Sequence, residues 1–170
     1  MYTKQQWSDS ISSYTELTQD KLNHIENGIY DNSSILESMK PKKVATLTFV
    51  GQDYNQENAG TGTCTADLLY IEHINICILK ANSPGNISGG NKQASSFVCD
   101  ATPYQQYLPL NNTTLHMYSG LSSYSSYEGF YKVQLVINVE QNKFVIQLQS
   151  FSNKSLVSGW TGNCTWIAGI

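Results

Sequence analysis

The feature that most constrains this chain is residues 18–40, where apolar side chains repeat at the heptad spacing of a coiled coil. A stripe this narrow cannot build a hydrophobic core alone, and an isolated helix of about 20 residues is only marginally stable in water. We therefore expect this helix to join copies of the chain. The residues on the alternating a and d positions, one of them polar, are Leu22, Ile25, Ile29, Asn32, Leu36 and Met39.

The ends of this segment carry helix boundary signals. Thr18 is a suitable N-cap, and Asp20 places a negative charge at the positive end of the helix dipole. Lys40 lies in the last turn, and Pro41 cannot continue the helix. These signals predict a helix that ends just before residue 41.

The charges beside the stripe favour parallel helices. Lys21 occupies a g position and Glu26 the e position of the next heptad, and such a pair meets between neighbouring chains when helices run parallel. The alternative is an amphipathic helix that packs on the rest of its own chain, since short heptad matches also arise by chance. Self-association is the interpretation that we develop.

Composition argues against nucleic acid and membrane partners. All ten positive side chains are Lys and the net charge is −3, so the chain lacks the Arg forks that commonly read phosphate and guanine. The first residues lack the apolar run of a signal peptide, and no later stretch has the length of a membrane span. We expect synthesis in a cytoplasm and no membrane insertion.

The cysteines indicate neither a disulfide framework nor a metal site. Cys64, Cys77, Cys99 and Cys164 form no CxxC pair, and with cytoplasmic synthesis we expect buried or free thiols. His73 and Cys77 are four residues apart, but that spacing brings ligands together on a helix, and this segment has the pattern of a strand. We expect no metal and no cofactor.

Catalytic motifs are also missing from the sequence. We find no nucleophile elbow, P-loop, dinucleotide fingerprint or HExxH motif, and the acidic residues after residue 41 show no paired spacing. The prediction is that the chain is not an enzyme. A glycan hydrolase remains an alternative, because folding can bring together two carboxylates that are distant in sequence.

Residues 41–170 have the pattern of short β-strands separated by Asn-, Ser-, Tyr- and Gly-rich loops. The segment 68–79 is almost continuously apolar, which predicts one long strand, or two with a bulge, buried on both faces. The clearest prediction is a hairpin of residues 132–139 and 143–151, with alternating apolar and polar side chains. Further strands are expected at 44–50, 96–101, 113–119 and 163–167.

These patterns predict a mainly β protein with an N-terminal α-helix. Residues 1–40 would form a leader and a helical stalk, and residues 41–170 an antiparallel β-sandwich or jelly-roll-like domain. This organisation separates a segment for association from a globular domain.

The first forty residues also carry a second, more specific pattern. Residues 17–29, LTQDKLNHIENGI, follow a leader that contains Trp7 and Asp9. This pattern is similar to the N-terminal part of baseplate, tail-fibre and head-fibre proteins of phages that infect low-GC Gram-positive bacteria. The resemblance implies a homotrimeric, receptor-binding virion component made in the host cytoplasm. It also implies that the leader, with Trp7, attaches the protein to other virion proteins.

The loops supply candidate binding residues. Tyr supplies rigid amphipathic contact area, and Ser, Gly and Asn supply adaptable hydrogen bonds. Tyr124 and Tyr127, with Glu128 beside them, and Trp160 in a second expected loop would suit a host cell-surface saccharide. The alternative is that these aromatic residues line an interface between subunits or cap the β-domain. A purely structural virion protein without saccharide binding is therefore the second interpretation.

Overall fold

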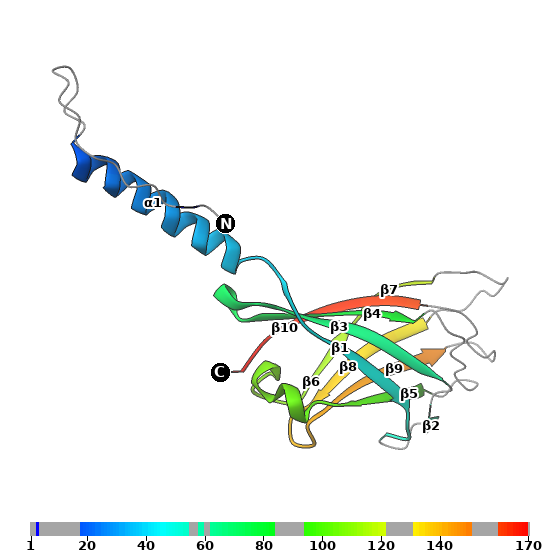
Figure 1. The fold of residues 1–170 in the computed structure, drawn as a ribbon. Coiled ribbons are helices and arrows are strands. Elements are labelled where there is room, and N and C mark those ends of the chain that lie inside the picture. Colours follow the sequence, from blue (N-terminus) through cyan, green and yellow to red (C-terminus); the bar gives the residue numbers. More distant parts are fainter. Residues whose placement is uncertain are drawn as a thin grey trace. The chain divides into compact units, whose positions relative to one another are not determined.

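The computed structural model describes residues 3, 18–54, 58–59, 62–83, 94–121, 131–150 and 160–169. The chain divides into two compact units. The first unit contains Met1–Pro41 and Ile71–Ile74, and the second contains Lys42–Tyr70 and Asn75–Ile170. Figure 1 shows the helix of the first unit and the strands of the second.

The first unit contains helix α1 (Gln19–Ser38) and the short 3₁₀ helix η1 (Glu72–Ile74). The predicted cap is present, because the Thr18 hydroxyl accepts a hydrogen bond from the Lys21 amide at 3.4 Å. Lys40 pairs with Glu37 in the last turn, at 2.6 Å. Within the described residues, neither α1 nor any other helix is long and apolar enough to cross a bilayer. The prediction of an N-terminal helix is confirmed.

The second unit is built around one sheet. Its strands follow the order β6-β8-β9-β5-β1-β3-β4-β10-β7, with β2 beside β5. β1 pairs antiparallel with β3 and β5, β10 with β4 and β7, β9 with β5 and β8, and β6 with β8, whereas the short pair of β2 with β5 is parallel. The strands are β1 (Lys42–Gly51), β2 (Asn58–Ala59), β3 (Thr63–Ile71), β4 (Ile76–Ser83), β5 (Ala94–Asp100), β6 (Thr113–His116), β7 (Tyr118–Leu121), β8 (Tyr131–Asn138), β9 (Lys143–Ser150) and β10 (Trp160–Ile167).

The two ends of this strand order belong to one continuous piece of chain. β6 pairs with β8 and β7 pairs with β10, and only Met117 separates β6 from β7. The Met117 amide also donates to the Val133 carbonyl at 3.0 Å. The sheet is therefore nearly closed on itself. The mainly β prediction is confirmed, but the described strands do not divide into the two facing sheets of a sandwich.

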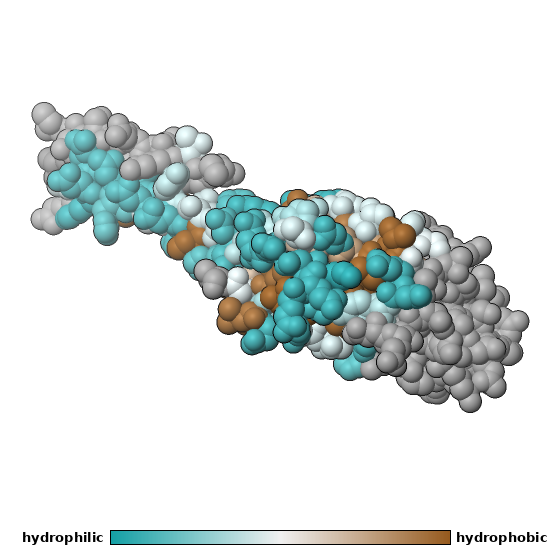
Figure 2. Space-filling model, turned by 90° about the horizontal axis from the view of Figure 1, so that it is seen from below, coloured by the Kyte–Doolittle hydropathy of each residue, from teal (hydrophilic) through white to brown (hydrophobic). Residues whose placement is uncertain are grey.

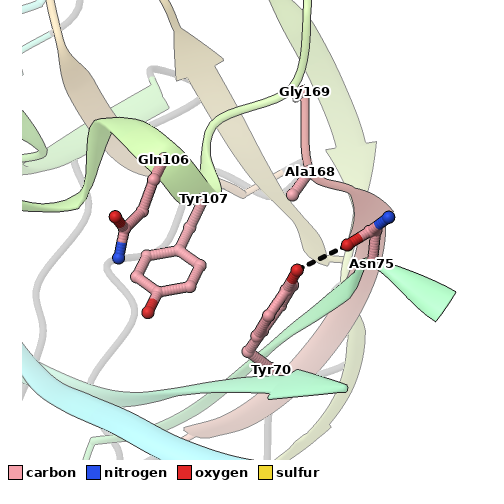
Figure 3. Close-up of a pocket in the computed structure, with 6 residues that line it drawn as sticks. All are labelled: Tyr70, Asn75, Gln106, Tyr107, Ala168 and Gly169. Atoms are coloured by element: carbon pink, nitrogen blue, oxygen red, sulfur yellow. Dashed lines mark hydrogen bonds between the residues drawn. The ribbon is translucent and has the colours of Figure 1, made fainter. Parts of the chain in front are cut away.

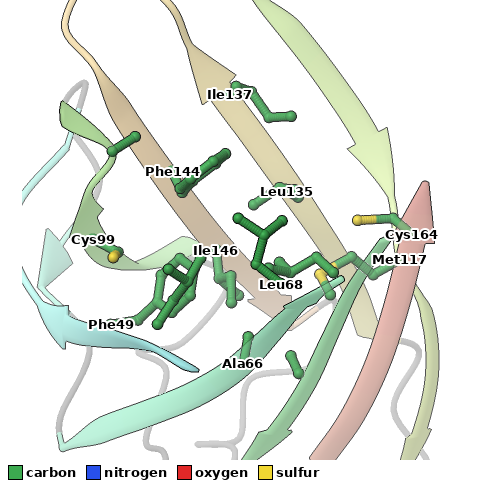
Figure 4. Close-up of a cluster of buried hydrophobic side chains, with 14 of the residues drawn as sticks. Phe49, Ala66, Leu68, Cys99, Met117, Leu135, Ile137, Phe144, Ile146 and Cys164 are labelled. Carbon is green, nitrogen blue, oxygen red and sulfur yellow. The ribbon is translucent and has the colours of Figure 1, made fainter. Parts of the chain in front are cut away.

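The core lies inside this nearly closed sheet, where Figure 4 shows buried side chains from most of its strands. The predicted hairpin is present as β8 and β9, and its inward residues alternate as expected. Asn142 in the connecting turn has a φ of 52°, which a non-glycine residue adopts most readily when it is Asn. The inward residues of the hairpin are Val133, Leu135, Ile137, Phe144, Ile146 and Leu148.

The segment 68–79 differs from its prediction. It forms the end of β3, the 3₁₀ helix η1 and the start of β4, with Asn75 at a φ of 53°. Leu68 and Leu79 are fully buried, whereas Leu69 and Ile78 are only half-buried. The near-continuous apolar run therefore reflects a turn between two strands and not one strand buried on both faces.

The opposite face of β5 and β9 is unexpectedly covered. Val98 and Val145 are buried there with Tyr54, which lies just after β1. The Asn138 side chain donates to the Tyr54 hydroxyl at 2.8 Å. On the same face, the Gln134 amide donates to the Gln147 side-chain oxygen. A simple division into an apolar inner face and a solvated outer face, as the alternation predicts, is therefore incomplete for this part of the sheet.

Candidate functional site

The helix α1 carries its predicted stripe on a solvent-exposed face. Ile25 is 53% exposed and Leu36 is 62% exposed, and Ile29, Asn32 and Met39 are exposed as well. Leu22, the first member, is half-buried. Exposure of several large apolar side chains along one line of a helix marks a surface that favours a partner.

Outside the stripe, the heptad pattern predicts the exposure of α1 side chains incorrectly. Glu26 is 5% exposed and is the one buried residue in this helix, although the heptad pattern placed it at the rim of an interface between chains. Tyr30 and Ile35, which are outside the heptad stripe, are exposed. The apolar surface of α1 is therefore broader than the predicted stripe.

A pocket lies in the second unit, in the region of η2 (Thr102–Tyr107) and the end of β10. Its volume is about 450 Å³, within the range of roughly 300–1,000 Å³ that is typical of small-molecule sites. Figure 3 shows two tyrosine rings and two side-chain amides around it. The lining residues are Tyr70, Asn75, Gln106, Tyr107, Ala168 and Gly169.

Hydrogen bonds at the start of η2 fix the position of this helix. Pro103 suits the first turn, where its missing amide proton costs nothing. The Asp100 carboxylate accepts bonds from the Thr102 hydroxyl at 2.7 Å and the Thr102 amide at 3.0 Å. These bonds, the hydroxyl bond first, hold the pKa of the Asp100 carboxyl below its usual value. The Asp100 side chain therefore holds the start of η2, the element that carries the pocket residues Gln106 and Tyr107.

The end of η2 is tied to the strands behind it. The Tyr107 carbonyl accepts a bond from the Trp166 indole at 2.7 Å and one from the Cys77 thiol at 3.5 Å. The Gly169 amide donates to the Leu108 carbonyl at 2.6 Å. A Cβ atom at Gly169 would lie 2.9 Å from the nitrogen of Leu110, so this position requires glycine. The backbone around the pocket is thus held by several independent contacts.

The two tyrosine rings lie against each other edge to face. The ring centroids of Tyr70 and Tyr107 are 5.1 Å apart with an interplanar angle of 65°. The Tyr70 hydroxyl donates to the Asn75 side-chain oxygen at 2.6 Å. The Asn75 carbonyl in turn accepts from the Ala168 amide at 2.8 Å. These bonds connect Tyr70 and Asn75 to the chain that follows β10.

Other polar groups of the pocket have no partner among the described residues. The Gln106 amide and the Tyr107 hydroxyl make no hydrogen bond there, and neither does the Asn75 side-chain nitrogen. The six lining residues include no charged side chain. Within the described part of the chain, no three His, Cys, Asp or Glu residues come together as metal ligands. The pocket therefore offers aromatic surface and neutral hydrogen-bonding groups.

The structure tests only some of the predicted site residues. Trp7, Tyr124, Tyr127 and Glu128 lie outside the described residues. Trp160 is not in a loop as expected, because its backbone begins β10 and is paired with Ser83 and Leu121. The loop prediction was wrong because Gly and Ser next to Trp160 resemble turn residues, whereas the pairing of β10 with β4 depends on contacts distant in sequence.

The four cysteines are free and buried, as predicted. Burial raises the pKa of the Cys64, Cys77 and Cys164 thiols to about 12. Burial likewise raises the pKa of Cys99 above its ordinary value. Protonated thiols of this kind are poor nucleophiles and poor metal ligands.

Sequence reasoning missed the pocket. The segment 101–110, with two prolines and two tyrosines, was visible as unusual, but it gave no helix signal. Tyr70 and Tyr107 are 37 residues apart, and no spacing rule relates a strand residue to a 3₁₀ residue at that distance. Only the fold brings these two side chains together.

Comparisons with models of protein families, with curated proteins and with solved structures gave no match.

Proposed function

We propose that this chain is a phage virion protein that forms a homotrimer through α1 and recognises a bacterial cell-surface saccharide through its second unit. We call this unit, Lys42–Tyr70 and Asn75–Ile170, the β unit. In this proposal the leader with Trp7 attaches the protein to other virion proteins at a baseplate, tail fibre or head fibre. The resemblance of the first forty residues supports the virion role. The protein would be made in the host cytoplasm and would act on the particle surface.

The observation that carries the proposal is the exposed stripe of α1. Ile25, Ile29 and Leu36 expose about half or more of their side-chain surface in the single chain. In a parallel trimer these residues would pack as a and d knobs, with Asn32 as a polar position that fixes the register. Three β units on one stalk would also gain avidity for a repeated saccharide, because each later binding event becomes intramolecular.

The test is the mass of the full-length protein in solution by light scattering. We expect a trimer for the natural chain and monomers, or insoluble protein, for Ile25→Lys combined with Ile29→Lys, because buried Lys charges oppose association. The matched control is Asn27→Lys combined with Ser34→Lys, which adds the same charge at exposed positions on the opposite side of α1. The control should remain a trimer.

Two results would contradict the stalk. A monomeric natural protein would do so, and so would a trimer that tolerates both Lys residues in the stripe. The structural alternative, a virion protein without saccharide binding, predicts trimers that do not sediment with host cell walls. Release of reducing ends from those walls would instead favour the hydrolase alternative.

A further inference from the structure

We propose that the pocket of Tyr70, Asn75, Gln106 and Tyr107 binds one ring of an uncharged saccharide. This inference rests on the proposed function, since it places saccharide recognition in the β unit at residues that sequence analysis did not select. It adds a ligand class, a neutral pyranose, and excludes anionic wall polymers as the ligand of this site. The pocket volume of about 450 Å³ is in the range for a small ligand.

The aromatic surface matches the apolar part of a sugar. One face of a pyranose presents several C–H groups, which pack favourably on an aromatic ring. Tyr70 and Tyr107 are both half-buried, so each has part of its surface in contact with protein and part available. Their edge-to-face contact keeps the rings at an angle, and a ligand ring can lie on one while its edge approaches the other.

The polar groups match hydroxyls. A side-chain amide and a phenol each both donate and accept hydrogen bonds, and so does a sugar hydroxyl. The Gln106 amide and the Tyr107 hydroxyl have no partner among the described residues, so a ligand would not displace protein contacts. The Asn75 nitrogen remains a donor while its oxygen accepts from Tyr70. Several neutral groups therefore line one cavity.

The described residues that line the pocket carry no charge, and this decides the ligand class. Proteins bind phosphate and carboxylate most strongly through Arg or Lys, which form short charge-assisted bonds. None of the six lining residues is charged, so a teichoic-acid phosphate would lose its hydration without an opposite charge in return. A neutral ring has no such cost.

The pocket is also held in position before a ligand arrives. The Tyr107 backbone is fixed by the Trp166 indole, and the Asn75 backbone is fixed by the Ala168 amide. A ligand that enters a preorganised site loses less free energy in ordering the protein. A single weak ring site is sufficient when several copies act together on a polymer.

The experiment uses the full-length protein and saturation-transfer NMR with N-acetylglucosamine, galactose and rhamnose as neutral probes and glycerol phosphate as the anionic probe. We expect the natural protein to bind at least one neutral probe and not glycerol phosphate. Gln106→Ala and Tyr107→Phe should each weaken that binding about 3- to 10-fold, the loss expected for one hydrogen bond.

Neighbouring residues of the same type provide matched controls. Gln105 is also exposed in η2, but its amide donates to Asn142 at 3.1 Å and it does not line the pocket. Tyr104 belongs to the same 3₁₀ helix and does not line the pocket either. Gln105→Ala and Tyr104→Phe should bind the neutral probe as the natural protein does.

Several results would overturn the inference: no binding of any neutral probe, binding of glycerol phosphate instead, or equal loss of binding in the controls. Light scattering on the same samples measures the mass of the protein, so the trimer proposal and the pocket proposal are tested separately. A trimer that binds no neutral probe overturns the pocket alone. A monomer that binds a neutral probe, with loss in the Gln106 variant, overturns the trimer and supports the pocket.

Discussion

The helix α1 and the β unit distribute their apolar side chains in opposite ways. In α1 the large apolar residues other than the half-buried Leu22 are on the surface, and the one buried residue is the acidic Glu26. In the β unit the three residues Phe49, Phe97 and Phe144 have no exposed surface. On the face shown in Figure 2, hydrophobic areas of the surface are interrupted by hydrophilic ones.

The two regions therefore obtain their stability from different sources. The β unit buries its own apolar surface, and that burial contributes about 25 cal/mol per Å². The stripe of α1 has no such contribution within one chain, so its stability should depend on protein concentration if copies associate. Substitutions in the two regions should therefore affect different measurements.

The largest expected effect is in the β core. Phe144→Ala removes a fully buried ring whose centroid is 5.9 Å from that of Trp166. Loss of such a ring leaves a cavity and costs about 3–5 kcal/mol of unfolding free energy. Denaturant unfolding followed by tryptophan fluorescence measures this loss.

The control for this variant is Glu140→Ala, at an exposed position in the turn before β9. It should change the unfolding free energy by less than about 0.5 kcal/mol. A folded Phe144→Ala protein should also keep the mass of the natural protein. Loss of association in that folded variant would contradict the separation of the two regions.

The sequence predicted the helix and the hairpin well, for a physical reason. Thr18 and Pro41 act on the backbone beside them, and the alternation in 132–139 and 143–151 acts within two neighbouring strands. These signals are local, so they survive without knowledge of the fold. The closure of the sheet at Met117 is not local, because it requires β6 and β7 to pair with different strands.

The pocket could not be predicted for the same reason. Tyr70, Asn75 and Tyr107 come from three separate turns or strand ends, and each is an ordinary residue in its own segment. The Asn75 conformation, with a φ of 53°, ends a run that periodicity alone describes as a strand. Sequence analysis instead selected aromatic residues by composition, and two of those, Tyr124 and Tyr127, lie outside the described residues.

The buried thiols give an intermediate test, confined to the β unit. In the folded protein we expect none of the four cysteines to react with a maleimide at neutral pH, and all four to react in urea. Raised pKa values also predict the effect of alkali. Unfolded thiols lose protons near pH 9.0, whereas the folded Cys64, Cys77 and Cys164 keep them to about 12, so their stabilising contribution is complete below pH 9.0 and is lost above it.

Mass spectrometry after labelling counts the modified thiols, and urea unfolding at several pH values measures the stability. Rapid labelling of a folded protein at neutral pH would contradict the buried positions. A free energy of unfolding that rises between pH 9 and 11 would contradict the predicted sign for these thiols.

The smallest expected effect is at the start of α1 and depends on the proposed trimer. Thr18→Ala removes the hydroxyl that accepts a hydrogen bond from the Lys21 amide. Because this bond is long, at 3.4 Å, we expect a loss of helix stability at the low end of the usual range for an N-cap, about 0.5 kcal/mol per helix. Summed over three helices, the loss is about 1.5 kcal/mol, which weakens trimer association roughly tenfold. The unfolding free energy of the β unit should stay unchanged. Light scattering over a dilution series measures the trimer, and Thr18→Ser, which keeps the hydroxyl, should dilute like the natural protein. An equal loss of β-unit stability in Thr18→Ala would mean that the helix and the β unit unfold as one, and the contrast between them would fail.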